Sequence, residues 1–217
     1  RFHYSAIKTY LCTQSSLYHM ITRRSVRIKA MQYIYAYETT ASAPASQFQN
    51  FLEKSILSVK EQYLYLLLSI REVANFVETD AKIKAGKHIK NEKDKNFNTK
   101  LLSNVIIQYL NNDKEFELEV KNAGVASLLD DDNIRQLYKK MTDAKEYNEY
   151  LTNGLEFNVE EDRAIVTFLL DNILLEDENF STNMDELFTN WMDDAEFVIE
   201  AVHEVIQKSK NQLKLHL

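Results

Sequence analysis

Residues 47–78 read QFQNFLEKSILSVKEQYLYLLLSIREVANFVE, without a glycine or a proline. Apolar residues recur along this stretch at intervals of three and four, namely at Phe51, Leu52, Ile56, Val59, Tyr63, Leu66, Leu67, Ile70, Val73 and Val77. That spacing places them on one face of an α-helix, which has about 3.6 residues per turn. We therefore predict one helix over 47–78, about 50 Å long at ~1.5 Å per residue, and an all-α protein built around it.

The composition supports an all-α fold and excludes several site types. The 217 residues include only three glycines and one proline, whereas β-sandwiches and barrels need a turn about every 8–12 residues. Gly86, Gly124 and Gly154 are too far apart to build a glycine-rich phosphate loop. The single cysteine, Cys12, excludes an internal disulfide framework and a cysteine-based metal site.

The same helical spacing recurs outside 47–78. It predicts a helix over 24–38, where Ile28, Met31, Ile34 and Tyr35 follow the spacing of one face. It also predicts helices over 100–111, 133–142, 143–152, 159–174, 184–191 and 193–209. The segment 41–46 is interpreted as a linker with Ser46 as an N-cap, and 122–124 as a turn. The acidic runs 130–132 and 160–162 suit helix N-termini, because carboxylates there bind free N–H groups. The lysine-rich segment 81–100 is interpreted as an exposed loop, with Asn96, Asn98 and Thr99 as capping candidates.

Charge is divided unevenly along the chain. Residues 1–100 have a net charge of +8 and residues 101–217 a net charge of −15. Residues 155–200 contain fourteen acids and only one base, Arg163. A basic first half suggests an anionic partner, and an acidic second half suggests a solvated or repelling surface.

No apolar run is long enough to cross a membrane, which takes about 20 residues. The segment 1–19 is interpreted as a disordered N-terminal extension, with one helical domain over 20–217. We expect a cytoplasmic protein without membrane contact.

Metal and catalytic motifs are weak. Glu200 and His203 have the i, i+3 spacing of half a di-iron site, but the chain holds no second such pair, so a boundary histidine is the better interpretation. No nucleophile, base and metal ligands converge. We therefore expect neither an enzyme nor a cofactor.

The most informative local motif is TRRSVRIKAMQYIY, residues 22–35. Arg23, Arg24 and Arg27 crowd the start of a helix, where cations oppose the helix dipole at a cost of roughly 0.3–1 kcal/mol each. A structural role does not explain that placement, whereas an anionic ligand does; the alternative interpretation is a solvated basic face. Arginine binds phosphate through its planar fork and stacks on unpaired bases.

The order Arg23-Arg24-x-x-Arg27, then Gln32 and Tyr35, resembles the N-terminal signature of the transcription antitermination factor NusB family, in its longer Bacteroidota variety. Further similarities occur at residues 63–69, the lysine-rich loop ending at 96–99, 134–138, 147–150, 160–162, 172–175 and 190–194. The similarity covers most of residues 20–210.

This resemblance implies an all-helical NusB-like bundle that binds boxA-type single-stranded RNA. It also implies a ribosomal small-subunit protein partner, NusE, and the transcription elongation complex. The RNA-binding residues that it implies are Arg23, Arg24 and Arg27, with Lys29 beside them, while Tyr35 is interpreted mainly as a packing residue. The lysines Lys87, Lys90 and Lys93 are interpreted as auxiliary RNA contacts.

The family's chains also have a second helical half, with an N-E-x-x-E-x-A-K type stretch and a closing F-x-N-G-x-L-D, and neither occurs here. We therefore expect an incomplete C-terminal half, with the helices over 159–174 and 193–209 lacking companions. The alternative function is a helical protein–protein interaction module without RNA binding.

Overall fold

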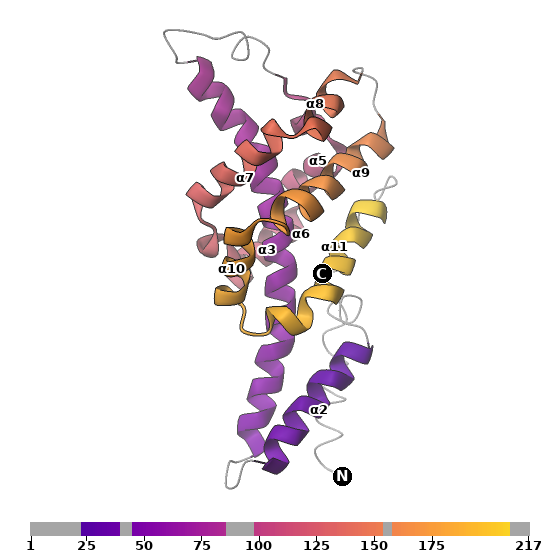
Figure 1. The fold of residues 1–217 in the computed structure, drawn as a ribbon. Coiled ribbons are helices and arrows are strands. Elements are labelled where there is room, and N and C mark those ends of the chain that lie inside the picture. Colours follow the sequence, from indigo (N-terminus) through magenta and orange to yellow (C-terminus); the bar gives the residue numbers. More distant parts are fainter. Residues whose placement is uncertain (1–22, 40–44, 86–97, 154–157, 209–217) are drawn as a thin grey trace.

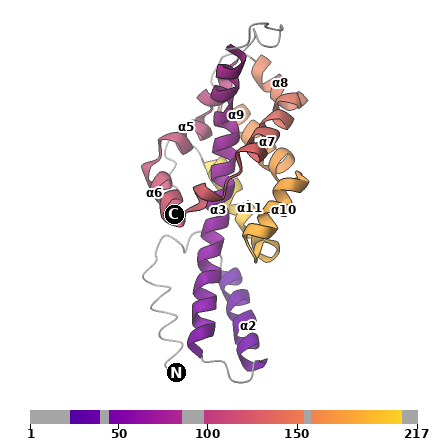
Figure 2. The ribbon, with the colours of Figure 1, turned by 90° about the vertical axis from the view of Figure 1, so that its left-hand side faces the viewer.

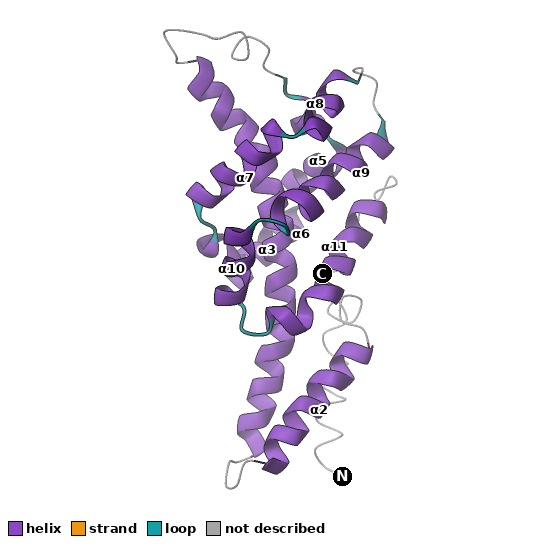
Figure 3. Ribbon diagram, in the orientation of Figure 1, coloured by secondary structure: helices purple, strands orange, loops and turns teal. Residues whose placement is uncertain are grey.

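A computed structural model describes residues 23–39, 45–85, 98–153 and 158–208. These residues form helices joined by turns, and none of them lies in a strand (Figure 3). The all-α prediction is therefore confirmed for the described ranges. The predicted extension 1–19 and most of the predicted loop 81–100 lie outside these ranges.

Helix α3, Ala45–Ala85, is the long axis of the molecule (Figure 1). It confirms the long helix predicted over 47–78 and extends it at both ends, so Ser46 lies inside the helix and the N-cap prediction for Ser46 is wrong. Residues 62–70 are all buried. A helix buried all round must be covered on every side, and the later helices surround the upper part of α3 (Figures 1 and 2).

Within the described ranges, eleven further elements pack against α3 or against one another. They are α2 (Arg23–Thr39), the 3₁₀ turn η2 (Lys100–Ser103), α5 (Val105–Asn112), α6 (Lys114–Ala123), the 3₁₀ turn η3 (Val125–Leu128), α7 (Asp131–Asp143), α8 (Lys145–Thr152), α9 (Val159–Phe168), the π-helical turn η4 (Leu169–Leu174), α10 (Glu178–Leu187) and α11 (Trp191–Lys208).

Asp130 begins a helix and Gly124 ends one, as the sequence predicted. The Asp130 carboxylate accepts the N–H of Asp132 at 3.0 Å and starts α7. Gly124 ends α6 with a φ of 70°, a left-handed conformation that glycine adopts without strain. In contrast, Asn104 divides the helix predicted over 100–111, because its Oδ1 accepts the N–H of Ile106 at 2.9 Å and starts α5 anew.

The apolar faces of the last helices are covered. Val166 and Leu170 on the 159–174 segment are buried, and so are Val198, Val202 and Ile206 on α11. These helices pack against each other and against α3. The expectation that they lack companions is therefore wrong.

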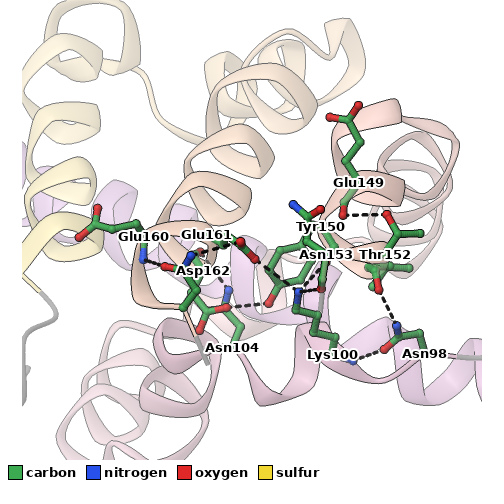
Figure 4. A network of polar contacts seen from close by, with 12 residues as sticks. Asn98, Lys100, Asn104, Glu149, Tyr150, Thr152, Asn153, Glu160, Glu161 and Asp162 are labelled. Carbon is green, nitrogen blue, oxygen red and sulfur yellow. Dashed lines mark hydrogen bonds and ion pairs between the residues drawn. The ribbon is translucent and has the colours of Figure 1, made fainter. Parts of the chain in front are cut away.

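A polar network joins η2, α8 and α9 (Figure 4). The Lys100 ammonium donates to the carbonyls of Tyr150 at 2.6 Å and Asn153 at 2.7 Å, and lies 4.4 Å from the centre of the Tyr150 ring. The Tyr150 hydroxyl donates to Asp162 Oδ1 at 2.7 Å. Lys100 therefore has a structural role, although the sequence placed it at the end of an exposed basic loop.

Candidate nucleic-acid interface

Helix α2 lies along the N-terminal part of α3, below most of the helices that surround the upper part of α3 and close to the start of α11 (Figure 1). Its inward side is formed by Lys29, which is buried, and by Val26 and Tyr33, which are half-buried and pack against the core. These residues follow the i, i+3, i+4, i+7 spacing of a helix face. The packed face therefore differs from the stripe of Ile28, Met31, Ile34 and Tyr35 that stands out in the sequence.

Lys29 is only 4% exposed and belongs to a buried ion pair. Its ammonium lies 2.7 Å from Asp194 Oδ1, at the start of α11, and donates to Ser55 Oγ on α3 at 2.9 Å. One side chain thus joins three helices. The interpretation of Lys29 as an RNA contact is wrong, because a phosphate could reach this ammonium only by breaking the pair.

Burial dominates the electrostatics of Asp194. It raises the pKa of the Asp194 carboxyl, while the hydrogen bond and charge of Lys29 and a hydrogen bond from Gln62 oppose that rise. The Gln62 amide nitrogen is 3.4 Å from Asp194 Oδ2, so Lys29 supplies the shorter contacts. Burying both charges of the Lys29–Asp194 pair costs desolvation free energy, which only their close contact offsets. The pair therefore fixes which side of α2 faces the protein.

The outward side of α2 combines a cation, an amide and an aromatic ring. Arg27 and Gln32 are exposed, Met31 is 70% exposed and Tyr35 is 73% exposed. Arg27, Met31 and Tyr35 are spaced by four residues, so they follow one another along one face. The interpretation of Tyr35 as mainly a packing residue is wrong, and the ring is available to a ligand.

The side chains of the other predicted RNA contacts lie outside what the structure describes. Arg23 and Arg24 form the first two positions of α2, but their side chains lie outside what the structure describes. Lys87, Lys90 and Lys93 lie in 86–97, also outside the described residues. Their roles stay predictions.

The remaining candidate chemistry is limited. His203 Nε2 lies 3.0 Å from Asp171 Oδ1 on the neighbouring π-helical turn, as suits a boundary histidine paired with a carboxylate. In the described ranges, no three His, Cys, Asp or Glu side chains are grouped to hold a metal ion. The described helices also include none that is long and apolar enough to span a membrane.

Comparisons with known proteins found no matching family model, no similar curated protein and no similar solved structure.

Proposed function

We propose that this chain binds single-stranded RNA through the outward face of α2. The observation that carries the proposal is the exposure of Arg27, Gln32 and Tyr35 on one side of the helix. A guanidinium group binds phosphate, an amide hydrogen-bonds to base edges, and a tyrosine ring stacks on an unpaired base. Duplexes do not offer splayed bases, so this combination favours a single strand.

The spacing of these groups suits a strand that runs along the helix. Arg27 and Tyr35 are eight residues apart, which separates their Cα atoms by about 12 Å along the axis. The dipole of α2 adds partial positive charge at its N-terminal end, where Arg23, Arg24 and Arg27 lie. The phosphate backbone would therefore lie near the N-terminal turn, with a base on Tyr35 two turns further along.

The resemblance to the NusB family gives the finer form of the proposal. The chain would act as a transcription antitermination factor on boxA-type RNA, with the ribosomal protein NusE and the transcription elongation complex as partners. Such a role requires neither an enzymatic activity nor a cofactor, and it implies a cytoplasmic protein. The motif residues Arg27, Gln32 and Tyr35 support it through their shared exposed face.

RNA binding can be tested by fluorescence anisotropy with a short boxA-like RNA and single variants of α2. Arg27→Ala should weaken binding about tenfold or more, since a charge-assisted hydrogen bond contributes on the order of 1.5–3 kcal/mol. Tyr35→Ala should lose a stacking contact and weaken binding by a similar factor, on the order of 1–3 kcal/mol. Arg23→Ala/Arg24→Ala/Arg27→Ala should abolish binding.

Arg135→Ala is the matched control, because Arg135 is an exposed arginine on α7, a helix distant from α2 along α3 (Figure 1). It changes the net charge by the same amount as Arg27→Ala and should leave the affinity within about twofold, since it removes only long-range attraction. If Arg27→Ala and Arg135→Ala weakened RNA binding equally, the effect of Arg27→Ala would come from overall charge and not from a contact. Unchanged binding by the triple variant would remove the RNA site from α2.

A second candidate function is the helical protein–protein interaction module, and the aliphatic part of the same face favours it. Ile28, Met31 and Ile34 are all exposed on α2. Apolar contacts respond weakly to salt, whereas the logarithm of an RNA affinity falls by about 0.7 for each phosphate neutralised on a single strand. A ligand whose affinity is insensitive to salt but is lost in Ile34→Ser would favour the interaction module.

A further inference from the structure

Arg163 stands in unusual surroundings for an arginine. It is the only base among the fourteen acids of residues 155–200, yet its side chain is not on the surface, since it is only 6% exposed. One of its three nitrogens, Nη1, donates to Glu160 Oε1 at 2.8 Å, and the Glu160 side chain is largely exposed. Among the described residues, the charge of Arg163 is therefore matched only by a solvent-facing carboxylate one turn earlier on α9.

The other two nitrogens of Arg163 have no partner among the described residues. Nε and Nη2 are both buried and without a hydrogen bond, and so is the hydroxyl of Thr167. Arg163 and Thr167 are four residues apart on α9, so their side chains are neighbours on one face. Buried donors in native proteins are almost always satisfied, so three such groups together call for a bound partner, which can be water or a ligand.

Arg163 and Thr167, the residues that carry these donors, line a hollow between α9, the π-helical turn η4 and α11. The hollow has a volume of about 430 Å³, and its lining includes Glu160, Arg163, Thr167, Phe168, Asn172 and Gln207. Helices α9 and α11 pack against each other beside it. The lining also includes the amide side chains of Asn172 and Gln207, which are polar, and the ring of Phe168, which is apolar.

We propose that this hollow is a binding site for a carboxylate. Nε and Nη2 form one edge of the planar guanidinium group, and that edge binds the two oxygens of a carboxylate through two parallel hydrogen bonds. The Thr167 hydroxyl, one turn further along α9, supplies a third donor. The site thus offers a geometric match to a planar, two-oxygen anion.

The charge around the hollow favours a carboxylate over a phosphate. The Glu160 carboxylate already occupies Nη1, and the second half of the chain carries a net charge of −15. A ligand with one negative charge completes the pairing of Arg163, whereas a phosphate dianion adds repulsion against Glu160 and the acidic surface. The carboxylate can belong to a small molecule or to an aspartate or glutamate side chain of another polypeptide segment.

The test uses the ¹⁵N-labelled full chain and the Nε–H signals of its arginines in NMR spectra. Sodium acetate is titrated against sodium chloride at equal ionic strength. The Arg163 signal should shift and saturate with acetate at millimolar concentration, and chloride should not shift it. Arg71 is the internal control, because its Nε already donates to Glu72 at 2.9 Å, and its signal should stay in place.

Two variants test whether the acetate-induced shift of the Arg163 signal depends on the proposed hydrogen-bond donors. Thr167→Val keeps the shape of the side chain but removes the hydroxyl, and it should weaken acetate binding on the order of fivefold, as one hydrogen bond does. Arg163→Lys keeps the charge but loses the two-donor edge, and it should weaken binding about tenfold or more. If Arg163→Lys does not fold, the titration of the unaltered chain and Thr167→Val still decide the question.

Three outcomes overturn the proposal. The first is an Arg163 signal that acetate leaves unmoved, and the second is one that acetate and chloride move equally. The third is tighter binding of inorganic phosphate than of acetate, which makes the hollow a general phosphate site. An N-acetylated, C-amidated alanine pentapeptide with one central glutamate identifies the source: tighter binding than acetate indicates a polypeptide carboxylate, and equal or weaker binding indicates a small-molecule carboxylate.

Discussion

Removing the ammonium of Lys29 should destabilise the protein far more than removing a surface lysine. Both members of the Lys29–Asp194 pair are buried, and their closest atoms are 2.7 Å apart. In Lys29→Met the carboxylate of Asp194 keeps a long contact of 3.4 Å to the Gln62 amide as its remaining side-chain hydrogen bond. Breaking a buried pair from one side costs about 3–5 kcal/mol.

The loss of unfolding free energy in Lys29→Met should depend on pH. Burial already raises the pKa of Asp194, and without Lys29 the carboxyl is more easily protonated still. A folded-state pKa above the unfolded value contributes stability that is present below the unfolded pKa and is lost as pH rises through the folded pKa. The deficit of Lys29→Met should therefore be about 3 kcal/mol at pH 7 and should shrink as the pH falls toward 4.

The assay is urea unfolding followed by circular dichroism at 222 nm, for the parent chain, Lys29→Met, Asp194→Leu and the double variant Lys29→Met/Asp194→Leu. The double variant replaces the pair with apolar side chains and should recover most of the loss, since such replacements are often neutral. The exposed pair of Lys208 and Glu204 gives the control: Lys208→Met should cost less than about 0.5 kcal/mol.

Two results would refute this reasoning. Lys29→Met could unfold at the same urea concentration as Lys208→Met, in which case the pair contributes no more than a surface contact. The double variant could be as unstable as the sum of the two single variants, in which case the losses come from packing and not from an uncompensated buried charge.

Three further predictions concern the helices around α3. Burial raises the pKa of Asp177, but hydrogen bonds from Lys140 and from backbone N–H groups outweigh it and hold that pKa below its usual value. The stability that the Asp177 carboxylate contributes should be present above pH ~4 and lost as the pH falls. In Asp177→Asn the midpoint urea concentration should therefore change less between pH ~6 and pH ~3 than in the parent chain. Tyr150→Phe leaves Asp162 Oδ1 without the donor at 2.7 Å and should cost about 1–3 kcal/mol in urea unfolding, whereas Tyr147→Phe should cost less. Circular dichroism should show a helix-dominated protein, and a strand content above about a quarter would contradict the architecture.

The sequence predicted the main axis of the fold because α3 carries an uninterrupted apolar period. It did not predict α6, whose ten residues bury only Phe116 and Val120 beneath charged side chains. It merged η2 and α5, because the apolar spacing continues through Asn104 while the Asn104 side chain restarts the backbone hydrogen bonding. Local periodicity therefore identified strongly apolar helices and missed features that depend on a few side chains.

The candidate site was harder to predict than the fold. The partner of Lys29 is Asp194, 165 residues away, and no local spacing joins them. The sequence showed that Ile28, Met31, Ile34 and Tyr35 share a face, but not whether that face turns toward the core. Arg163 was noticed as the lone base of an acidic region, yet its unpaired donors depend on burial between α9 and α11.

The buried pair explains why the outward face of α2 is outward. Successive residues of an α-helix are rotated by about 100°, so Arg27 and Met31, two positions on either side of Lys29, point nearly opposite to it. The ammonium of Lys29 contacts Asp194 and Ser55 on the inward side of α2. Arg27 therefore faces solvent, and Tyr35 lies on the outward side as well. Lys29 therefore serves the proposed RNA surface as a positioning residue: it orients the helix and does not touch the strand.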